Sequence, residues 1–118
     1  MEKYLLFSSG GGSADPLNFD KTEMGIWPAS SFLGLRASSA RTIDLFFKAH
    51  QEGDFFTHDK VVLSIKNGTH IAVAKAITNT IFNSSNGVIS VADMDNGRYI
   101  DNNIFNCEIT YAIKEDLL

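Results

Sequence analysis

The feature that most constrains the fold is a regular alternation of apolar and polar residues in four segments between Thr42 and Ile113. In each segment the core-facing apolar residues have odd numbers, as expected for strands with one buried face. They are Ile43, Leu45 and Phe47; Val61, Leu63 and Ile65; Ile89 and Val91; and Cys107, Ile109, Tyr111 and Ile113. The pattern predicts four half-buried strands around one core.

A helix is predicted between the second and third of these segments. Val73, Ile77 and Ile81 recur every fourth residue, which is typical of a helix with one apolar face, here from about His70 to Asn83. Thr69 precedes it, and a threonine hydroxyl at that position can accept a hydrogen bond from a free amide. A crossover of this length predicts that the strands at 60–66 and 88–92 are parallel and right-handed.

The first forty residues add further strands. Residues 3–8 carry Tyr4 and Leu6 on one side and Leu5 and Phe7 on the other, so we expect both faces of this strand to be covered. Two short strands are expected near 24–27 and 32–36. The whole pattern predicts a single α+β domain over residues 1–118, with a mixed, mainly antiparallel sheet of about five to six strands and one helix packed on one face.

Composition narrows the class of protein. The chain has 118 residues, of which 44% are hydrophobic and 20% charged, which is typical of a soluble globular domain rather than a membrane span. A net charge of −4 and ten scattered cations argue against nucleic acid as a partner. The first residues lack a cleavable signal sequence and Cys107 is the single cysteine, so we expect a cytoplasmic or virion location without secretion.

Two polar motifs are candidate ligand sites. Gly10, Gly11 and Gly12 follow a strand, but the sequence lacks the helix start and the lysine that phosphate-binding loops use. Asp93, Asp95 and Asp101 offer oxygen ligands of the kind that calcium takes, but the glycine comes one place early and the twelfth-position glutamate is missing. We therefore expect turn residues and no bound metal or cofactor, with a small-molecule or divalent-cation binding module as the alternative.

Catalytic signals are also weak. His50, His58 and His70 lie on different predicted elements, and no serine has the Gly-x-Ser-x-Gly context of a nucleophile. We expect no enzymatic activity. An unrecognised small enzyme remains a second alternative, with His58 beside Asp59 or Asp54 as its base, near Phe55 and Phe56.

The apolar residues are in excess of what one helix can cover. Phe46 and Val62 lie on the strand faces that should be wet, and Phe55 and Phe56 occupy a loop. These four residues are the predicted interface, and a second copy of the chain is the expected partner, because closed homo-oligomers dominate soluble assemblies. The competing interpretation is that the segment around Trp27, Phe32 and Leu35 covers this face within one chain.

Several segments together resemble small uncharacterised proteins of marine tailed phages, some of which are regarded as virion components. They are Tyr4-Leu5-Leu6-Phe7, Leu17-Asn18-Phe19-Asp20, Thr42-Ile43-Asp44-Leu45, and Val73-Ala74-Lys75-Ala76-Ile77 followed by a short final sheet segment. The resemblance rests on apolar patterning and transfers no site residues. It implies a structural protein that associates with itself or with other phage structural proteins, without a cofactor or catalysis.

Overall fold

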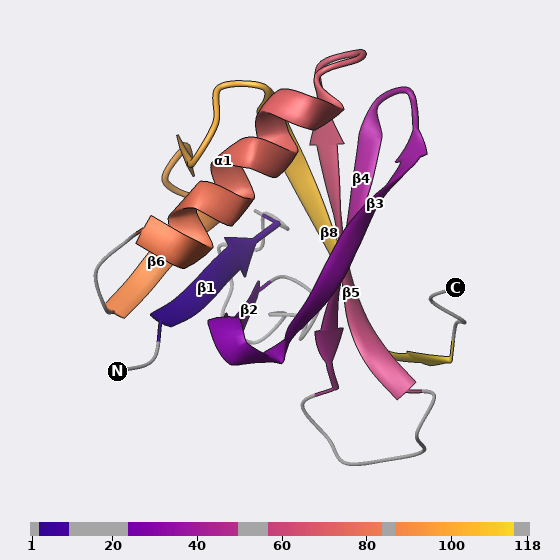
Figure 1. Ribbon diagram of the computed structural model, residues 1–118, viewed down its shortest axis with the longest axis vertical. Coiled ribbons are helices and arrows are strands. Elements are labelled where there is room, and N and C mark those ends of the chain that lie inside the picture. The colour runs from indigo at the N-terminus through magenta and orange to yellow at the C-terminus, as the bar shows by residue number, and fades with distance from the viewer. Residues whose placement is uncertain (1–2, 10–23, 50–56, 84–86, 115–118) are drawn as a thin grey trace.

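The computed structural model describes residues 3–9, 24–49, 57–83 and 87–114, and these form eight strands, one α-helix and one short 3-10 turn (Figure 1). In chain order the elements are β1 (Lys3–Ser8), β2 (Met24–Pro28), the turn η3 (Ala29–Ser31), β3 (Phe32–Ser39), β4 (Thr42–Lys48), β5 (Thr57–Ile65), α1 (His70–Asn83), β6 (Gly87–Asp93), β7 (Arg98–Tyr99) and β8 (Ile104–Lys114). The expected α+β class is confirmed at this level. The described residues contain no helix with the length and apolarity that a membrane crossing requires.

The strands form two sheets rather than the single sheet of five to six strands that the sequence predicted. Sheet A has the order β2-β1-β6-β7, and sheet B has the order β3-β4-β5-β8. Sheet B is antiparallel throughout, whereas β1 and β6 of sheet A are parallel. The predicted parallel pairing of β5 with β6 is wrong, because α1 carries the chain out of sheet B and β6 then pairs with β1.

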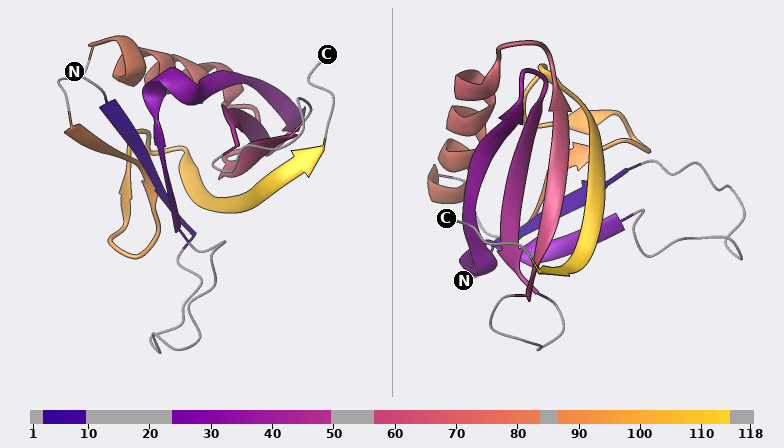
Figure 2. Two further views of the ribbon diagram at one scale, coloured as in Figure 1. Left: turned by 90° about the horizontal axis from the view of Figure 1, so that it is seen from below. Right: turned by 90° about the vertical axis from the view of Figure 1, so that its right-hand side faces the viewer.

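The hydrophobic core lies between the two sheets, and α1 runs across the opening that they leave (Figure 2). Each of the three layers contributes fully buried side chains. These include Leu5, Phe7 and Trp27 from sheet A, Leu45, Phe47, Val61 and Leu63 from sheet B, and Val73 and Ile77 from α1. The second sheet therefore covers the apolar face that one helix could not cover alone.

Trp27 connects the two sheets. Its indole stacks on Phe47 with ring centroids 5.0 Å apart, and its Nε1 donates a hydrogen bond of 2.9 Å to Asp59 of sheet B. A Cβ atom at Gly25 would lie 2.4 Å from the Trp27 ring, so this position requires glycine. The indole is thus held by stacking and by a buried hydrogen bond, and Gly25 on the same strand leaves room for its ring.

The odd-number pattern of inward residues is confirmed where the structure describes it, and two shifts in strand register explain why the even-numbered Ala92 and Ile104 are also buried. The pairing of β1 with β6 shifts between Leu6 and Phe7, which places Ala92 opposite Phe7 and buries it despite its even number. A similar shift at Ile65 pairs that residue with the buried Ile104 of β8. A bulge adds one residue to a strand and so reverses the parity beyond it.

Helix α1 has the predicted bounds, His70–Asn83. The hydroxyl of Thr69 donates to the carbonyl oxygen of Lys66 at 2.7 Å rather than serving as the predicted N-cap acceptor. The Thr69 carbonyl accepts the Val73 amide at 3.1 Å, which is the first bond of the helix. The tight turn before the helix places Gly68 at a φ of 74°, and this turn brings the Thr69 hydroxyl back to Lys66.

Candidate functional site

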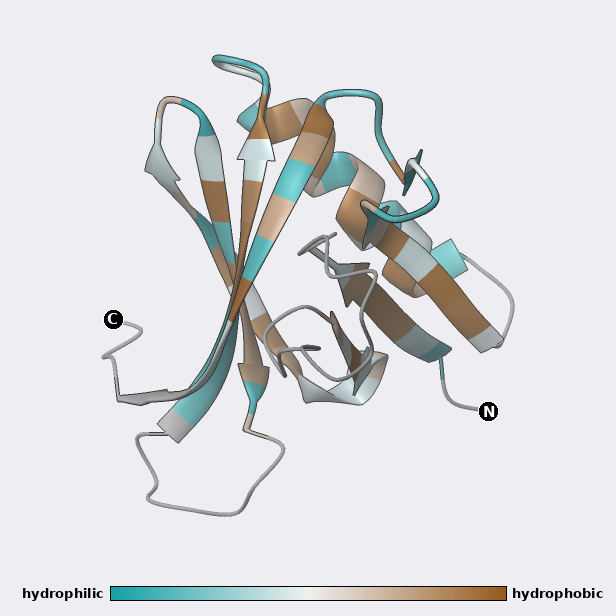
Figure 3. Cartoon of the chain, turned by 180° about the vertical axis from the view of Figure 1, so that it is seen from behind, coloured by the Kyte–Doolittle hydropathy of each residue, from teal (hydrophilic) through white to brown (hydrophobic). Residues whose placement is uncertain are grey.

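The outer face of sheet A is the most unusual surface of the molecule. In β1, Leu5 and Phe7 point into the core and are fully buried, whereas Tyr4 and Leu6 point away from it. Viewed from the side opposite α1, β1 and β6 carry hydrophobic residues along most of their length (Figure 3). The prediction that both faces of β1 are covered is therefore not met, because Tyr4 remains 41% exposed.

Strand register collects the outward residues of three strands into rows. Tyr4 lies between Pro28 of β2 and Val88 of β6, and Leu6 lies between Ile26 and Ser90. Met24 of β2 extends the surface beside Ser8. We define the apolar face as Tyr4, Leu6, Met24, Ile26, Pro28 and Val88. Val88 is its most exposed member at 61%, so a methyl-rich surface is presented to water.

One end of the apolar face is acidic. At the C-terminal ends of β1 and β6, Ser8 donates a hydrogen bond of 2.7 Å to Asp95, and Asp93 accepts hydrogen bonds from the backbone amide and the side chain of Asn96. The two rows that contain Tyr4 and Leu6 hold no aspartate, glutamate, lysine or arginine. Arg98 of β7 pairs with Asp93 at the same end, so two aspartates stand beside one arginine there. Charge is therefore confined to one end of the face, and its sum at that end is negative.

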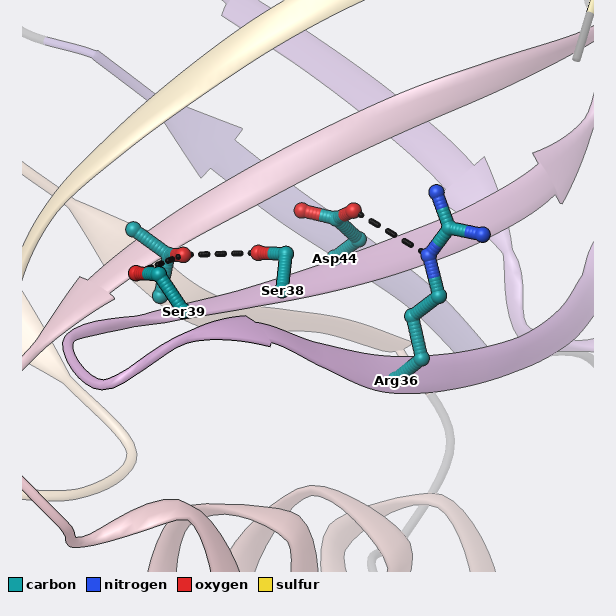
Figure 4. Close-up of polar contacts among 5 residues, drawn as sticks. Arg36, Ser38, Ser39 and Asp44 are labelled. Atoms are coloured by element: carbon teal, nitrogen blue, oxygen red, sulfur yellow. Dashed lines mark hydrogen bonds and ion pairs between the residues drawn. The ribbon is translucent and has the colours of Figure 1, made fainter.

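The outer face of sheet B has the opposite character. Arg36 of β3 faces Asp44 of β4, and its Nε lies 3.4 Å from an Asp44 carboxylate oxygen (Figure 4). Beside this pair, the hydroxyls of Ser38 and Ser39 each lie 2.6 Å from that of Thr42. Charged and hydroxyl side chains thus occupy much of the outer side of β3 and β4, beside the exposed Leu33.

Phe46, the central residue of that predicted interface, is only 3% exposed within a single chain. The Arg36 guanidinium lies 4.9 Å from its ring centroid, and the His58 ring meets it edge-on at 5.2 Å. Val62 is half-buried between Asp44 and Glu108, its neighbours on the adjacent strands. Phe46 therefore adds almost no exposed apolar area to the outer face of sheet B.

Other predicted positions lie outside the described residues. They are His50, Asp54, Phe55, Phe56 and the Gly10–Gly12 loop.

The structure separates the three aspartates that the sequence placed in one candidate cation site. Asp93 and Asp95 lie beside Ser8, whereas Asp101 accepts a hydrogen bond from the Asn103 amide in the turn before β8. Within the described residues, no group of three or more His, Cys, Asp or Glu side chains is placed to hold a metal ion. Asp93 instead accepts hydrogen bonds from Asn96 in the turn that follows it, and Asp95 accepts one from Ser8 of β1.

The candidate base His58 and its neighbour Asp59 do not face each other. Successive strand residues point to opposite faces, and Asp59 bonds to Trp27 in the core while His58 packs on Phe46 outside it. The Nε2 atom of His58 is buried without a hydrogen-bond partner, and His70 is engaged with the Ser39 carbonyl at 2.6 Å. The described residues therefore hold no histidine–carboxylate pair of the kind predicted at this position.

Cys107 is a buried thiol at the junction of the sheets, as the sequence predicted. Its Sγ lies 3.9 Å from the Ala92 carbonyl oxygen, and burial, together with the negative charge of Asp93, raises the pKa of the thiol from 9.0 to about 12. A thiol that holds its proton this tightly is a poor nucleophile and a poor metal ligand at neutral pH.

A shallow depression lies on the outer side of β3. It has a volume of about 190 Å³ and is lined by Leu33, Gly34, Leu35, Arg36 and Phe46. Arg36 already contacts Asp44 and Phe46 there. The depression therefore offers a small apolar surface beside a charge that is already paired.

Sequence reasoning missed the apolar face, although its signal was present. Tyr4 and Leu6 alternate with Leu5 and Phe7, which indicates apolar residues on both sides of β1. That pattern is also typical of a strand buried between two layers. Only the register with β2 and β6 shows that further apolar residues, and no covering layer, lie on the second side of β1.

Comparison with known proteins found no match: the chain matches no protein-family model, no curated protein and no solved structure.

Proposed function

We propose that this protein is a non-enzymatic assembly module that self-associates through the apolar face of sheet A. The observation that carries the proposal is the row of Pro28, Tyr4 and Val88 on three adjacent strands, of which Tyr4 and Val88 are exposed. Burying such a surface between two chains removes apolar area from water, and this is the main favourable term in protein association.

The size of the face favours a weak or transient contact. Three strands and three rows at ordinary strand spacing cover on the order of 300 Å² per copy. A stable interface of standard size needs about 800 Å² from each partner. Self-association through this face alone is therefore expected to be concentration-dependent, and a permanent dimer would need additional contacts.

The proposal moves the interface from the residues that the sequence suggested. Phe46 is already packed under Arg36 and against His58, so replacing it would disturb the fold before it tested an interface. Tyr4 and Val88 have exposed side chains, and their substitution changes the surface directly. A role as a virion component would use the same surface, and it predicts that neighbouring genes encode capsid or tail proteins.

Light scattering over a wide concentration range tests the proposal. The average molecular mass of the unmodified chain in solution should rise with its concentration. The Val88→Asp variant should remain a monomer, because each copy would bring a carboxylate into an apolar contact. Ile71→Asp is the matched control, since Ile71 is 72% exposed but lies on α1, away from sheet A's outer face. A chain that stays monomeric at the highest concentration, or an equal loss in both variants, would contradict the proposal.

A further inference from the structure

We infer that two copies pack their apolar faces together with antiparallel strands, about a two-fold axis that crosses the strands between the Tyr4 and Leu6 rows. This inference rests on the proposed self-association and adds the arrangement of the partner copy. It is carried by the distribution of charge and of apolar residues along the outer face of sheet A.

Symmetry leaves two simple arrangements for identical faces. A closed dimer uses the same patch on both chains, so the two-fold axis of a face-to-face pair lies in the plane of the interface. An axis along β1 keeps the strands of the two copies parallel and places each residue row on the same row of the partner. An axis across the strands makes them antiparallel and reverses the order of the rows.

The acidic end of the face distinguishes the two arrangements. Asp93 and Asp95 lie at the C-terminal ends of β1 and β6, beside Ser8, and Arg98 of β7, which pairs with Asp93, offsets only one of their two charges. Parallel packing brings these carboxylates of both copies to the same end of the interface, where partial exclusion of water strengthens their repulsion. Antiparallel packing places the acidic ends of the two copies at opposite ends of the interface, where they are farthest apart.

The apolar rows fix the position of the axis. The rows of Tyr4 and Leu6 are the two that lack aspartate, glutamate, lysine and arginine. A two-fold axis between them places the Tyr4 row of one copy on the Leu6 row of the other. Both rows are then buried in both copies. Val88 then lies opposite Ser90 of the second copy, and Pro28 lies opposite its Ile26.

Thiol cross-linking in two mixtures tests the arrangement. One mixture combines Val88→Cys with Ser90→Cys chains, and the other combines Val88→Cys with Pro28→Cys chains; one chain of each pair carries an isotopic mass label. Packed sheets lie about 10 Å apart, which is too far for a direct disulfide, so a short thiol-to-thiol reagent is used. Antiparallel packing predicts a several-fold higher yield of mixed dimer from Val88→Cys with Ser90→Cys. Parallel packing predicts the reverse.

Light scattering on the unmodified chain separates the two levels of the proposal. A monomer at all concentrations contradicts the proposed function itself. A dimer that cross-links mainly through Pro28→Cys, or through neither mixture, contradicts only the antiparallel arrangement. As a second measurement, Asp95→Asn should leave the dissociation constant within about twofold in the antiparallel dimer, whereas it should tighten a parallel dimer by relieving repulsion.

Discussion

The outer faces of the two sheets differ in what they do with their apolar residues. On sheet B, Phe46 is covered by Arg36 and His58, and Leu33 and Leu35 lie beside it. On sheet A, Tyr4 and Val88 stand beside other apolar residues and stay exposed. A single aromatic residue on an outer face can thus be covered within the chain, whereas the apolar residues that lie side by side on three strands of sheet A leave Tyr4 and Val88 exposed.

The contrast also shows which side chains can cover an aromatic ring. Arginine and histidine have flat polar groups that pack on a ring and keep one side toward water. The apolar face of sheet A has no such residue in the rows of Tyr4 and Leu6. The difference between the two faces therefore originates in a few neighbouring residues rather than in the aromatic residues themselves.

The largest expected effect comes from truncating the sealed ring. Phe46→Ala should lower the free energy of unfolding by about 3 to 5 kcal/mol, because it removes a buried ring and leaves a cavity. Tyr4→Ala should lower it by only about 1 kcal/mol, because Tyr4 is already partly exposed. Urea unfolding followed by the fluorescence of Trp27, the single tryptophan, measures both. Equal losses of unfolding free energy in the two variants would contradict the view that Phe46 is buried within the chain while Tyr4 is not.

Alkaline pH tests the junction that holds the two sheets together. Burial raises the pKa of Cys107 from 9.0 to about 12, and burial followed by the charge of Asp59 raises the pKa of Tyr111 above 10.0. Both side chains reach sheet A, where the Tyr111 hydroxyl donates to the Met24 carbonyl at 2.8 Å and the Cys107 thiol approaches Ala92. The ionised forms are therefore disfavoured only in the folded chain.

The sign of the pH effect follows from this difference. Below about pH 9 the thiol is protonated in both states, and its contribution to stability is complete. Above that pH the unfolded thiol loses its proton first, so stability should fall by about 2 to 3 kcal/mol by about pH 11. Cys107→Ala is the control, since it removes this part of the slope and keeps that of Tyr111. A variant with the unchanged slope would show that the thiol does not carry the effect.

The strand pattern predicted the inward residues well because burial selects side chains at every second position. The bounds of α1 and the presence of β2 and β3 also followed from local sequence, although β3 continues to Ser39, three residues beyond the predicted end. The division into two sheets did not, because the alternation in β5 and β6 is the same whether they share a sheet or face each other across the core. The pairing of β1 with β6 depends on residues some eighty positions apart, which no local pattern records.

The candidate surface was only partly predictable for a similar reason. The two-sided apolar pattern of β1 was visible, but its outer side becomes a patch only when Ile26 and Val88 lie beside it. Conversely, Phe46 looked exposed from its even number, although Arg36 lies close to it from the neighbouring strand. In both cases the decisive neighbour comes from a different strand, so strand pairing must be known first.

The smallest expected effect concerns the ion pair on the polar face. Asp44→Asn keeps the shape of the side chain but removes its charge, and should lower the free energy of unfolding by about 1 kcal/mol. The value is modest because the Arg36 side chain is 43% exposed and its Nε lies 3.4 Å from the carboxylate. Arg36→Met should lower stability more, because it leaves the nearly buried carboxylate of Asp44 without this partner and uncovers Phe46. Urea unfolding of both variants at low and high salt measures the difference. A larger loss of stability in Asp44→Asn than in Arg36→Met would contradict this prediction. It would show that the charge of Asp44 does more than hold Arg36 over the Phe46 ring.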